Sequence, residues 1–537
     1  MNEFSTKGGA SKGADVIIVG AGHNGMVTAC YLAKAGVDVL VVEAHSKIGG
    51  MTVTGEMEEA PGHMINEGAM QASSFPGTTI DADLGLTAKY GLRMRFMDPY
   101  HVHLSPEGES LAFWKDPRKT VEEMKYFSPK DAKSFLELCE IMDAALEIGL
   151  PMMQTSPVRP EFGKLMQTVG KAVRHIGKFG KIINWAIPSA AEILETTFEH
   201  SMVRAPVCSL LPFGSFKADF SGWGLIYFAM IHRSGAAMFM GGTGNLCDSL
   251  ERCLKDHGGR VRTSAPVESL IVQSGRVTGV RLQSGEEIMA RKAVVTTMSP
   301  KDALTRLLPK GVLSPTLAKR AEHIPTLNRG NTDYLLNLAL KGKITMTRHQ
   351  QWRDRHCKNP ADLRFPCITW NTYQEALDAW DACNRGEVPE KLAGLAHMTT
   401  AIDPSLAPDG HETIWFWAGL TPSKPRESWD NVRDTITERA IKELAQYYDR
   451  IEELEIGRHA VVMPDIAKRF WALDGNVFHG DVLLSRSGPL KPALGLAGYK
   501  TPVPGFFISG GGTHPVAGIA GLPGQITARV VLRNLRK

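Results

Sequence analysis

The stretch that most constrains how this chain can fold lies near its N-terminus, over residues 15–43, DVIIVGAGHNGMVTACYLAKAGVDVLVVE. The short β-branched run at 16–19 is typical of a buried parallel strand. A helix is expected over 24–35, because Gly36 follows it as a favourable C-terminal cap. A second apolar strand is expected over 37–42. The stretch therefore predicts a strand–helix–strand unit with both strands parallel in one sheet.

The turn of this unit has the residues that a dinucleotide site needs. Gly20 allows a sharp turn, Gly22 lets the backbone approach a pyrophosphate, and Gly25 lets the helix pack closely on the strand. The helix N-terminus favours negative phosphate, and Glu43, about 20 residues further on, can accept hydrogen bonds from ribose hydroxyls. The residues expected to contact the dinucleotide here are Gly20, Ala21, Gly22, His23, Asn24, Gly25 and Glu43.

A second pair of glycines follows the acidic residue, in Ala44-His-Ser-Lys-Ile-Gly49-Gly50-Met51, where the backbone can pass close to a cofactor. An N-terminal G-x-G-x-x-G, then Glu-Ala, then x-Gly-Gly resembles the flavoproteins with two dinucleotide-binding domains, which include amine oxidases and carotenoid (phytoene) desaturases. The resemblance implies FAD as the cofactor, with Ala44, Gly49, Gly50 and Met51 near it. Lys47 and Met51 stand where many members carry an arginine.

The same resemblance runs through the whole chain in order, with its strongest matches at 15–68, 235–300 and 464–532. It is closest to the branch of pyridine nucleotide-disulphide oxidoreductase-domain proteins. In the middle match, a glycine-rich turn opens a helix and a hairpin over 267–282 follows. In the last match, a strand leads into two glycine loops and a helix. The further cofactor contacts that the resemblance implies are Glu67, Gly68, Val267, Thr297, Gly510, Gly511, Gly518 and Ile519.

These features predict an α/β fold: a two-dinucleotide-binding-domain, Rossmann-like FAD fold with an interleaved α+β substrate domain. A chain of 537 residues is too long for one hydrophobic core, so several domains are expected. The expected division is a flexible tail at 1–14, FAD-binding segments at 15–95, 235–300 and 461–537, a substrate or cap segment at 96–234 and the rest of the substrate domain at 301–460.

Composition excludes several other classes of function. A formal net charge of +4 gives no reason to expect nucleic acid as a partner. The eight cysteines are scattered without a C-x-x-C pair or a metal-ligand spacing, so we expect no metal and a reducing, cytoplasmic location. The first 14 residues lack the apolar region of a signal peptide, and no stretch reaches the ~20 apolar residues of a membrane span.

A basic amphipathic helix is expected within 159–187. Apolar residues recur there at helical spacing, lysines and arginines occupy the other side, and Glu161 is the single acid. Two interpretations are open. The segment can lie on an anionic membrane as a peripheral contact, or it can be a lid or cap helix with a solvated lysine face.

The expected function is FAD-dependent dehydrogenation or desaturation of an apolar organic substrate (isoprenoid, carotenoid-like or aromatic), by hydride transfer to flavin with oxygen or a quinone as acceptor. His514 and His479 fall in motifs placed beside the flavin, and either can act as a base or polarise a substrate carbonyl. Alternatively, His514 only orders its loop. The competing functions are a flavin amine oxidase and a non-catalytic FAD-fold binding module.

Overall fold

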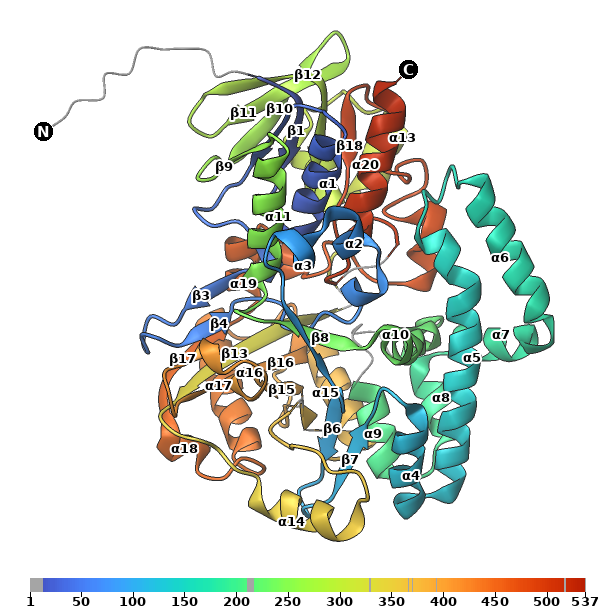
Figure 1. The fold of residues 1–537 in the computed structure, drawn as a ribbon, viewed down its shortest axis with the longest axis vertical. Coiled ribbons are helices and arrows are strands. Elements are labelled where there is room, and N and C mark those ends of the chain that lie inside the picture. Colours follow the sequence, from blue (N-terminus) through green and yellow to red (C-terminus); the bar gives the residue numbers. More distant parts are fainter. Residues whose placement is uncertain are drawn as a thin grey trace, which may run out of the picture.

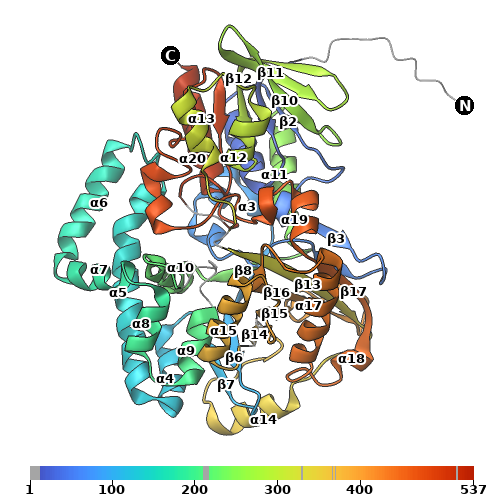
Figure 2. The same ribbon diagram turned by 180° about the vertical axis from the view of Figure 1, so that it is seen from behind.

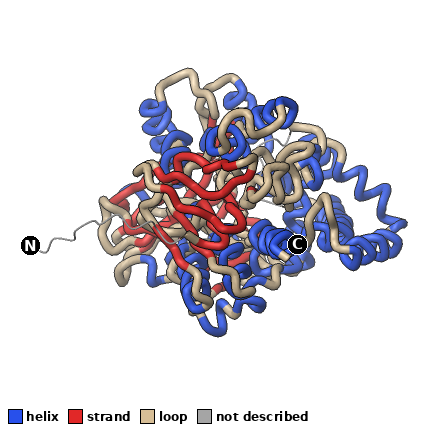
Figure 3. Tube along the Cα trace, turned by 90° about the horizontal axis from the view of Figure 1, so that it is seen from above, coloured by secondary structure: helices blue, strands red, loops and turns tan. Residues whose placement is uncertain are grey.

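The computed structural model describes residues 13–209, 217–327, 330–365, 367–368, 370–392, 394–515 and 518–536. Most of the tail expected at 1–14 therefore lies outside the described residues. Two sheets form two halves of the molecule, one above the other in Figure 1, and a set of long helices stands along one side of both. Seen from behind, in Figure 2, the same helices again form the outer edge. Seen from above, in Figure 3, the strands gather toward the middle with helices around them.

The upper sheet is built from three segments that are far apart in the sequence. Its strand order is β10-β11-β12-β1-β2-β9, and β18 pairs with β12. β1, β2, β9, β12 and β18 are mutually parallel, while β10, β11 and β12 form an antiparallel meander. The strands are β1 (Ala14–Val19), β2 (Val39–Val42), β9 (Arg260–Arg262), β10 (Val267–Gln273), β11 (Arg276–Leu282), β12 (Glu287–Thr296) and β18 (Phe506–Ile508). This is the Rossmann-like α/β arrangement that the sequence predicted.

Strand β1 is apolar on both faces because both faces of the upper sheet are covered. Val16 and Ile18 pack into a core shared with helices α1 (His23–Lys34), α11 (Gly244–Asp256) and α20 (Leu522–Leu535). Ile17 and Val19 pack on the other side, against residues of β10 and β11. A parallel strand that is buried on both sides reads as a continuous apolar run, which is why the run at 16–19 identified it.

The lower sheet has one face in a core and the other toward the upper half. Its order is β17-β13-β16-β15-β14-β6-β7. Alternate residues such as Tyr334, Leu336 and Phe416 pack against α17 (Trp429–Leu444), whereas Leu335 and Trp415 face the opposite way. The strands are β6 (His101–Leu104), β7 (Ser110–Phe113), β13 (Asn331–Leu340), β14 (Cys367–Ile368), β15 (Leu395–Met398), β16 (Glu412–Pro422) and β17 (Glu455–Val461).

Two short strand pairs connect the halves: β3 (Thr54–Glu56) with β4 (Met64–Asn66), and β5 (Met94–Met97) with β8 (Ala236–Phe239). The remaining helices are α2 (Ile80–Leu84), α3 (Leu86–Lys89), α4 (Pro117–Phe127), α5 (Pro129–Met153), α6 (Phe162–Arg174), α7 (Phe179–Ala186), α8 (Ala190–Thr197), α9 (Ser201–Ser209), α10 (Ile226–Ser234), α12 (Pro300–Asp302), α13 (Pro315–Glu322), α14 (Thr347–His356), α15 (Tyr373–Asn384), α16 (Thr399–Ile402), α18 (Ile451–Leu454) and α19 (Met463–Phe470).

The helix expected within 159–187 is two helices, α6 and α7, separated by a 3-10 turn at Ile176–Lys178. Gly177 lies in that turn, and glycine weakens a helix interior by about 1 kcal/mol relative to alanine. No helix in the described part of the chain is both long enough and apolar enough to cross a membrane.

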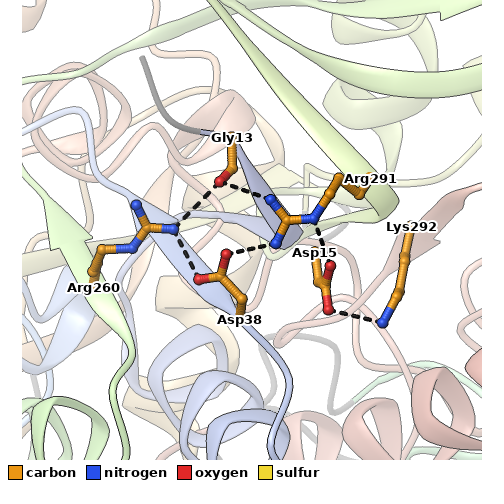
Figure 4. Close-up of polar contacts among 6 residues, drawn as sticks. All are labelled: Gly13, Asp15, Asp38, Arg260, Arg291 and Lys292. Carbon is orange, nitrogen blue, oxygen red and sulfur yellow. Dashed lines mark hydrogen bonds and ion pairs between the residues drawn. The ribbon is translucent and has the colours of Figure 1, made fainter.

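An ion network closes the end of the upper sheet that lies away from the glycine turn (Figure 4). Arg291 of β12 bridges Asp15 of β1 and Asp38 just before β2, at 2.7 Å to each. Arg260 of β9 and Lys292 of β12 add further ion pairs to the same two carboxylates. The network therefore joins four strands of the sheet, although its side chains remain partly exposed and each pair contributes modestly.

A buried ion pair stabilises the lower half. Arg353 of α14 is 1% exposed and binds Glu123 of α4 through Nη2 at 2.6 Å and Nη1 at 3.0 Å. Glu123 also accepts hydrogen bonds from the backbone N–H of Ala112 and from Trp114 Nε1. The carboxylate thus ties β7, the chain after it and two helices together.

We expect Arg353→Met to lower the free energy of unfolding by about 3–5 kcal/mol, because it leaves the Glu123 carboxylate buried without its cation. The matched control is Arg291→Met in the exposed network, where solvent screens the ion pairs and a much smaller loss is expected. Scanning calorimetry of both variants measures the difference. Similar melting temperatures for the two variants would contradict this assignment.

Candidate functional site

A large cavity opens between the two sheets, at the carboxyl ends of β1 and β2. Its empty volume is about 1860 Å³, a figure that includes the open mouth. Most of the residues expected to contact a dinucleotide line it. These are Gly20, Gly22, His23, Asn24, Gly25, Glu43, Ala44, Gly50, Met51, Glu67, Gly68, Val267, Thr297, Gly511, Gly518 and Ile519.

Three other expected contacts, Ala21, Gly49 and Gly510, are not among the described residues that line the cavity. Their positions are structural. The backbone N–H of Gly49 donates to the carbonyl of Ala21 at 3.0 Å, which joins the two glycine loops. A Cβ on Gly510 would lie 2.6 Å from the carbonyl oxygen of Thr297, so glycine allows these two loops to touch.

The glycine turn has the geometry expected from its spacing. A Cβ on Gly25 would lie 2.1 Å from the carbonyl oxygen of Gly20, so only glycine lets α1 start this close to β1. At Gly22, in contrast, no protein atom lies closer than 3.9 Å to the position of a Cβ, so the missing side chain leaves room on the cavity side. Close packing and open access are therefore provided by different glycines of one motif.

Glu43 lies at the end of β2 and faces this turn. Its Oε2 accepts the backbone N–H of Ala21 at 2.8 Å, and its Oε1 accepts the backbone N–H of His45 at 3.0 Å. The carboxylate is 8% exposed and lines the cavity. Each oxygen retains a lone pair for a hydroxyl donor, as ribose recognition requires.

Buried polar atoms on the same wall fit a bound nucleotide. Among the described residues, Asn24 Oδ1 and His45 Nε2 have no hydrogen-bond partner, and both residues line the cavity. Buried polar groups are normally paired, so these two atoms are available to bind a ligand in the cavity. Together with the space beside Gly22, they show that these residues fit a dinucleotide such as FAD.

The other wall of the cavity comes from the lower half and is mainly aromatic. Its apolar side chains come from β13, β15, β16, α19 and the chain after α19: Leu335, Leu395, Trp415, Trp417, Ile466, Phe470, Trp471, Val477 and Phe478. Trp415 Nε1 donates to the carbonyl of Gly68 at 3.0 Å. This bond fixes the indole beside the wall formed by the expected dinucleotide contacts, which we call the dinucleotide wall. A mostly apolar wall excludes water from the space next to a cofactor.

Two charged features interrupt this wall. Glu67 Oε2 and Arg469 Nε form an ion pair at 2.7 Å across the cavity lining. Asp333 of β13 is 5% exposed and receives one hydrogen bond, from Trp417 Nε1 to Oδ1 at 2.8 Å. Sequence reasoning missed Asp333. The available signal was a lone acid in the apolar strand sequence NTDYLLNLAL.

The two candidate histidines have different positions. His479 lines the cavity, and burial lowers its pKa to about 4, so its imidazole is neutral near pH 7. His514 is not among the described lining residues; its Nε2 donates to the carbonyl of Met152 at 3.0 Å. Burial also lowers the pKa of His514 to about 4, against the opposing effect of that hydrogen bond.

Comparison with known proteins agrees with this geometry. A family model described as flavin containing amine oxidoreductase matches residues 25–521. Pyridine nucleotide-disulfide oxidoreductase domain-containing protein 2 of Rattus norvegicus is 27% identical, over 97% of this chain and 94% of the relative. Phytoene desaturase (lycopene-forming) of Pantoea ananas is 22% identical, over 96% and 99%. The solved structure of cyclohexylamine oxidase from Brevibacterium oxydans IH-35A shares the fold, with a TM-score of 0.59, 19% identity and coverage of 98% and 100%.

The glycine turn generates a direct prediction. We expect Gly25→Ala to weaken FAD binding at least tenfold, because the new Cβ would push α1 away from the carbonyl oxygen of Gly20. The FAD content of the purified protein and a fluorescence titration with FAD measure the effect. Gly149→Ala in α5 is the matched control, because nothing lies within 4 Å of its Cβ position. FAD affinity as high in Gly25→Ala as in this control would show that the turn does not hold the dinucleotide.

Proposed function

The chain belongs to the flavin containing amine oxidoreductase family and is an FAD-dependent oxidoreductase, and from this premise we propose that it dehydrogenates or desaturates an apolar organic substrate of isoprenoid, carotenoid-like or aromatic character. The family confirms the cofactor and the fold predicted from the sequence. The observation that carries the proposed substrate class is the aromatic and aliphatic wall that faces the dinucleotide wall across one cavity. The phytoene desaturase relative is named for a hydrocarbon substrate, which agrees with an apolar wall.

We assign the parts of the cavity as follows. The turn from Gly20 to Gly25 and the start of α1 would hold the phosphates, and Glu43 would hold a ribose. The residues Gly511, Gly518 and Ile519 would contact the flavin end. FAD, when bound, accepts the hydrogen that the substrate loses.

The protein's own side chains orient the substrate and exclude water. Trp415 is held by its hydrogen bond to the Gly68 carbonyl, and Trp417 by its hydrogen bond to Asp333. His479 lines the cavity, and its Nδ1 has no partner among the described residues. Because its imidazole is neutral, this nitrogen can accept a proton from a substrate, which makes His479 our first candidate for a base. His514, bound to the Met152 carbonyl, is the second.

An amine oxidase is the second candidate function, because the family description names amines. The electron acceptor that we propose is oxygen or a quinone. One experiment decides both the substrate class and the electron acceptor, since substrate and acceptor act on the same flavin.

We expect anaerobic addition of an apolar hydrocarbon or alcohol to bleach the flavin absorption of the FAD-loaded protein. Simple amines of the same carbon skeleton should not. Oxygen or a soluble quinone should then restore the oxidised spectrum, and the faster of the two identifies the acceptor. Bleaching by amines alone would replace our proposal with the amine oxidase. Fully oxidised flavin after every substrate class would refute it.

We also propose that the protein touches a membrane surface through helices α6 and α7, from which an apolar substrate is taken. α6 shows an inverted amphipathic pattern. Its apolar side chains point away from the protein: Phe162 is 76% exposed, Val173 64%, and Ile176, just beyond the helix, 72%. The figures place both helices at the outer edge of the molecule in opposite views (Figures 1 and 2).

The polar side of α6 faces the protein instead. Lys164 Nζ donates to Gln154 Oε1 at 2.6 Å, and His175 Nε2 lies 3.0 Å from Glu147 Oε2 of α5. A lid with a solvated lysine face would have the opposite orientation. Arg174 and Lys181 pair with acids of α5 but stay 70% and 60% exposed. Exposed apolar side chains flanked by cations match an anionic lipid surface.

We expect the FAD-loaded protein to sediment with vesicles of phosphatidylcholine and phosphatidylglycerol, and much less with phosphatidylcholine alone. The double variant Val173→Asp with Ile176→Asp should lose this binding, because both side chains are exposed and their replacement adds negative charge. Phe96→Gln, which changes an exposed aromatic residue elsewhere, is the control. Equal sedimentation of the double variant and the control would refute the proposal, as would a dimer held together by these residues.

A further inference from the structure

Asp333 is the carboxylate of the cavity for which the cofactor assignment gives no role. It lies on β13, at the point where the pairing of β13 with β16 shifts register between Thr332 and Tyr334. The shift leaves Gly419 and Leu420 of β16 opposite Asp333, and such β-bulges are common beside active sites. Asp333 and Leu335 line the cavity, while Tyr334 between them packs into the core on the other face. The strand therefore presents the carboxylate to the substrate space.

One oxygen of this carboxylate is free. Oδ1 accepts the N–H of Trp417, whereas Oδ2 is buried and has no hydrogen-bond partner among the described residues. Glu67, another carboxylate that lines the cavity, is paired with Arg469 at 2.7 Å. An unpaired buried oxygen costs about 1–3 kcal/mol, so a donor on a ligand in the cavity would relieve that cost at Oδ2.

Among the described residues, no cation pairs with this carboxylate. Burial raises the pKa of Asp333 to about 7, and the hydrogen bond from Trp417 opposes that rise only in part. A group of the ligand is therefore the natural partner for Oδ2.

We propose that Asp333 Oδ2 anchors a proton-donating group, an O–H or N–H, on an otherwise apolar substrate. This inference rests on the proposed function and narrows its substrate class: the substrate is an apolar skeleton with one polar end, rather than a pure hydrocarbon. The indole of Trp417 fixes the carboxylate, and the aromatic wall takes the skeleton. The polar end thereby sets which bond of the skeleton lies beside the cofactor wall, so Asp333 determines specificity.

The test uses three probes with one skeleton: 3-phenylpropan-1-ol, its methyl ether and 3-phenylpropylamine. Binding to the FAD-loaded protein is measured anaerobically from the shift of the flavin absorption bands, which needs no turnover. At about pH 8.5, above the pKa of about 7 for Asp333, the carboxyl is ionised and only accepts hydrogen bonds. We then expect the wild-type protein to bind the alcohol roughly tenfold or more tightly than the ether, because a hydrogen bond to a buried charged group discriminates by about that factor. Binding without reduction would refute the proposed dehydrogenation alone.

Three variants test whether Asp333 causes the preference for the alcohol over the ether. Asp333→Leu should abolish the preference for the alcohol over the ether, with FAD affinity unchanged. Leu335→Val, on the same face of β13, is the matched control and should weaken alcohol and ether equally. Asp333→Asn keeps an acceptor without charge; retained alcohol binding there identifies a hydroxyl donor, and loss confined to the amine identifies an ammonium.

Several results would overturn the inference. These are no band shift with the alcohol in the wild-type protein, equal affinity of the wild-type protein for alcohol and ether, or an alcohol preference that survives in Asp333→Leu. A loss of FAD affinity in Asp333→Asn would overturn it as well, because it would assign Asp333 to the cofactor.

Discussion

The cofactor half of the molecule depends on how closely α1 approaches the end of β1. The missing side chain of Gly25 permits this approach, since a Cβ there would lie 2.1 Å from the Gly20 carbonyl oxygen. With α1 in place, the free N–H groups at its start and the Glu43 carboxylate face one space. The ion network of Arg291 closes the opposite end of the same sheet. The cofactor end of the upper sheet is therefore formed by loops and glycines, whereas ion pairs and apolar packing stabilise the rest of the sheet.

The cavity lies between two sheets that are covered differently. The centre of the upper sheet is covered on both faces, so β2 and residues 16–19 of β1 are apolar throughout. The lower sheet is covered by α17 on one face and lines the cavity with the other, which alternation along β13 and β16 makes possible. Trp415 and Trp417 therefore come from successive outward positions of a single strand. Asp333 lies at the bulge between β13 and β16 and is the charged residue that β13 adds to this wall.

Helix α6 shows that an amphipathic pattern does not by itself define which face is buried. The repeat of apolar residues identifies α6 as a helix. Its polar side, however, binds Glu147 of α5 and Gln154 just after α5. Ion pairs and hydrogen bonds to a charged neighbour reverse the usual orientation and leave Phe162 and Val173 in contact with solvent. Which face of α6 is exposed is therefore determined by its contacts with the neighbouring helix α5.

The sequence by itself determined the fold class, because glycine spacing, β-branched runs and the acid after β2 act locally. Its resemblance to a family gave the cofactor, and most of the residues it marked as cofactor contacts line one cavity. It also determined the hairpin at 267–282, whose turn and alternation are local as well. Only the tertiary structure decided that Asp333 and Trp417, 84 residues apart, share a hydrogen bond in the cavity. It likewise separated His479, which lines the cavity, from His514, which binds Met152. Such pairings depend on which strands lie side by side, and no local pattern of residues records that.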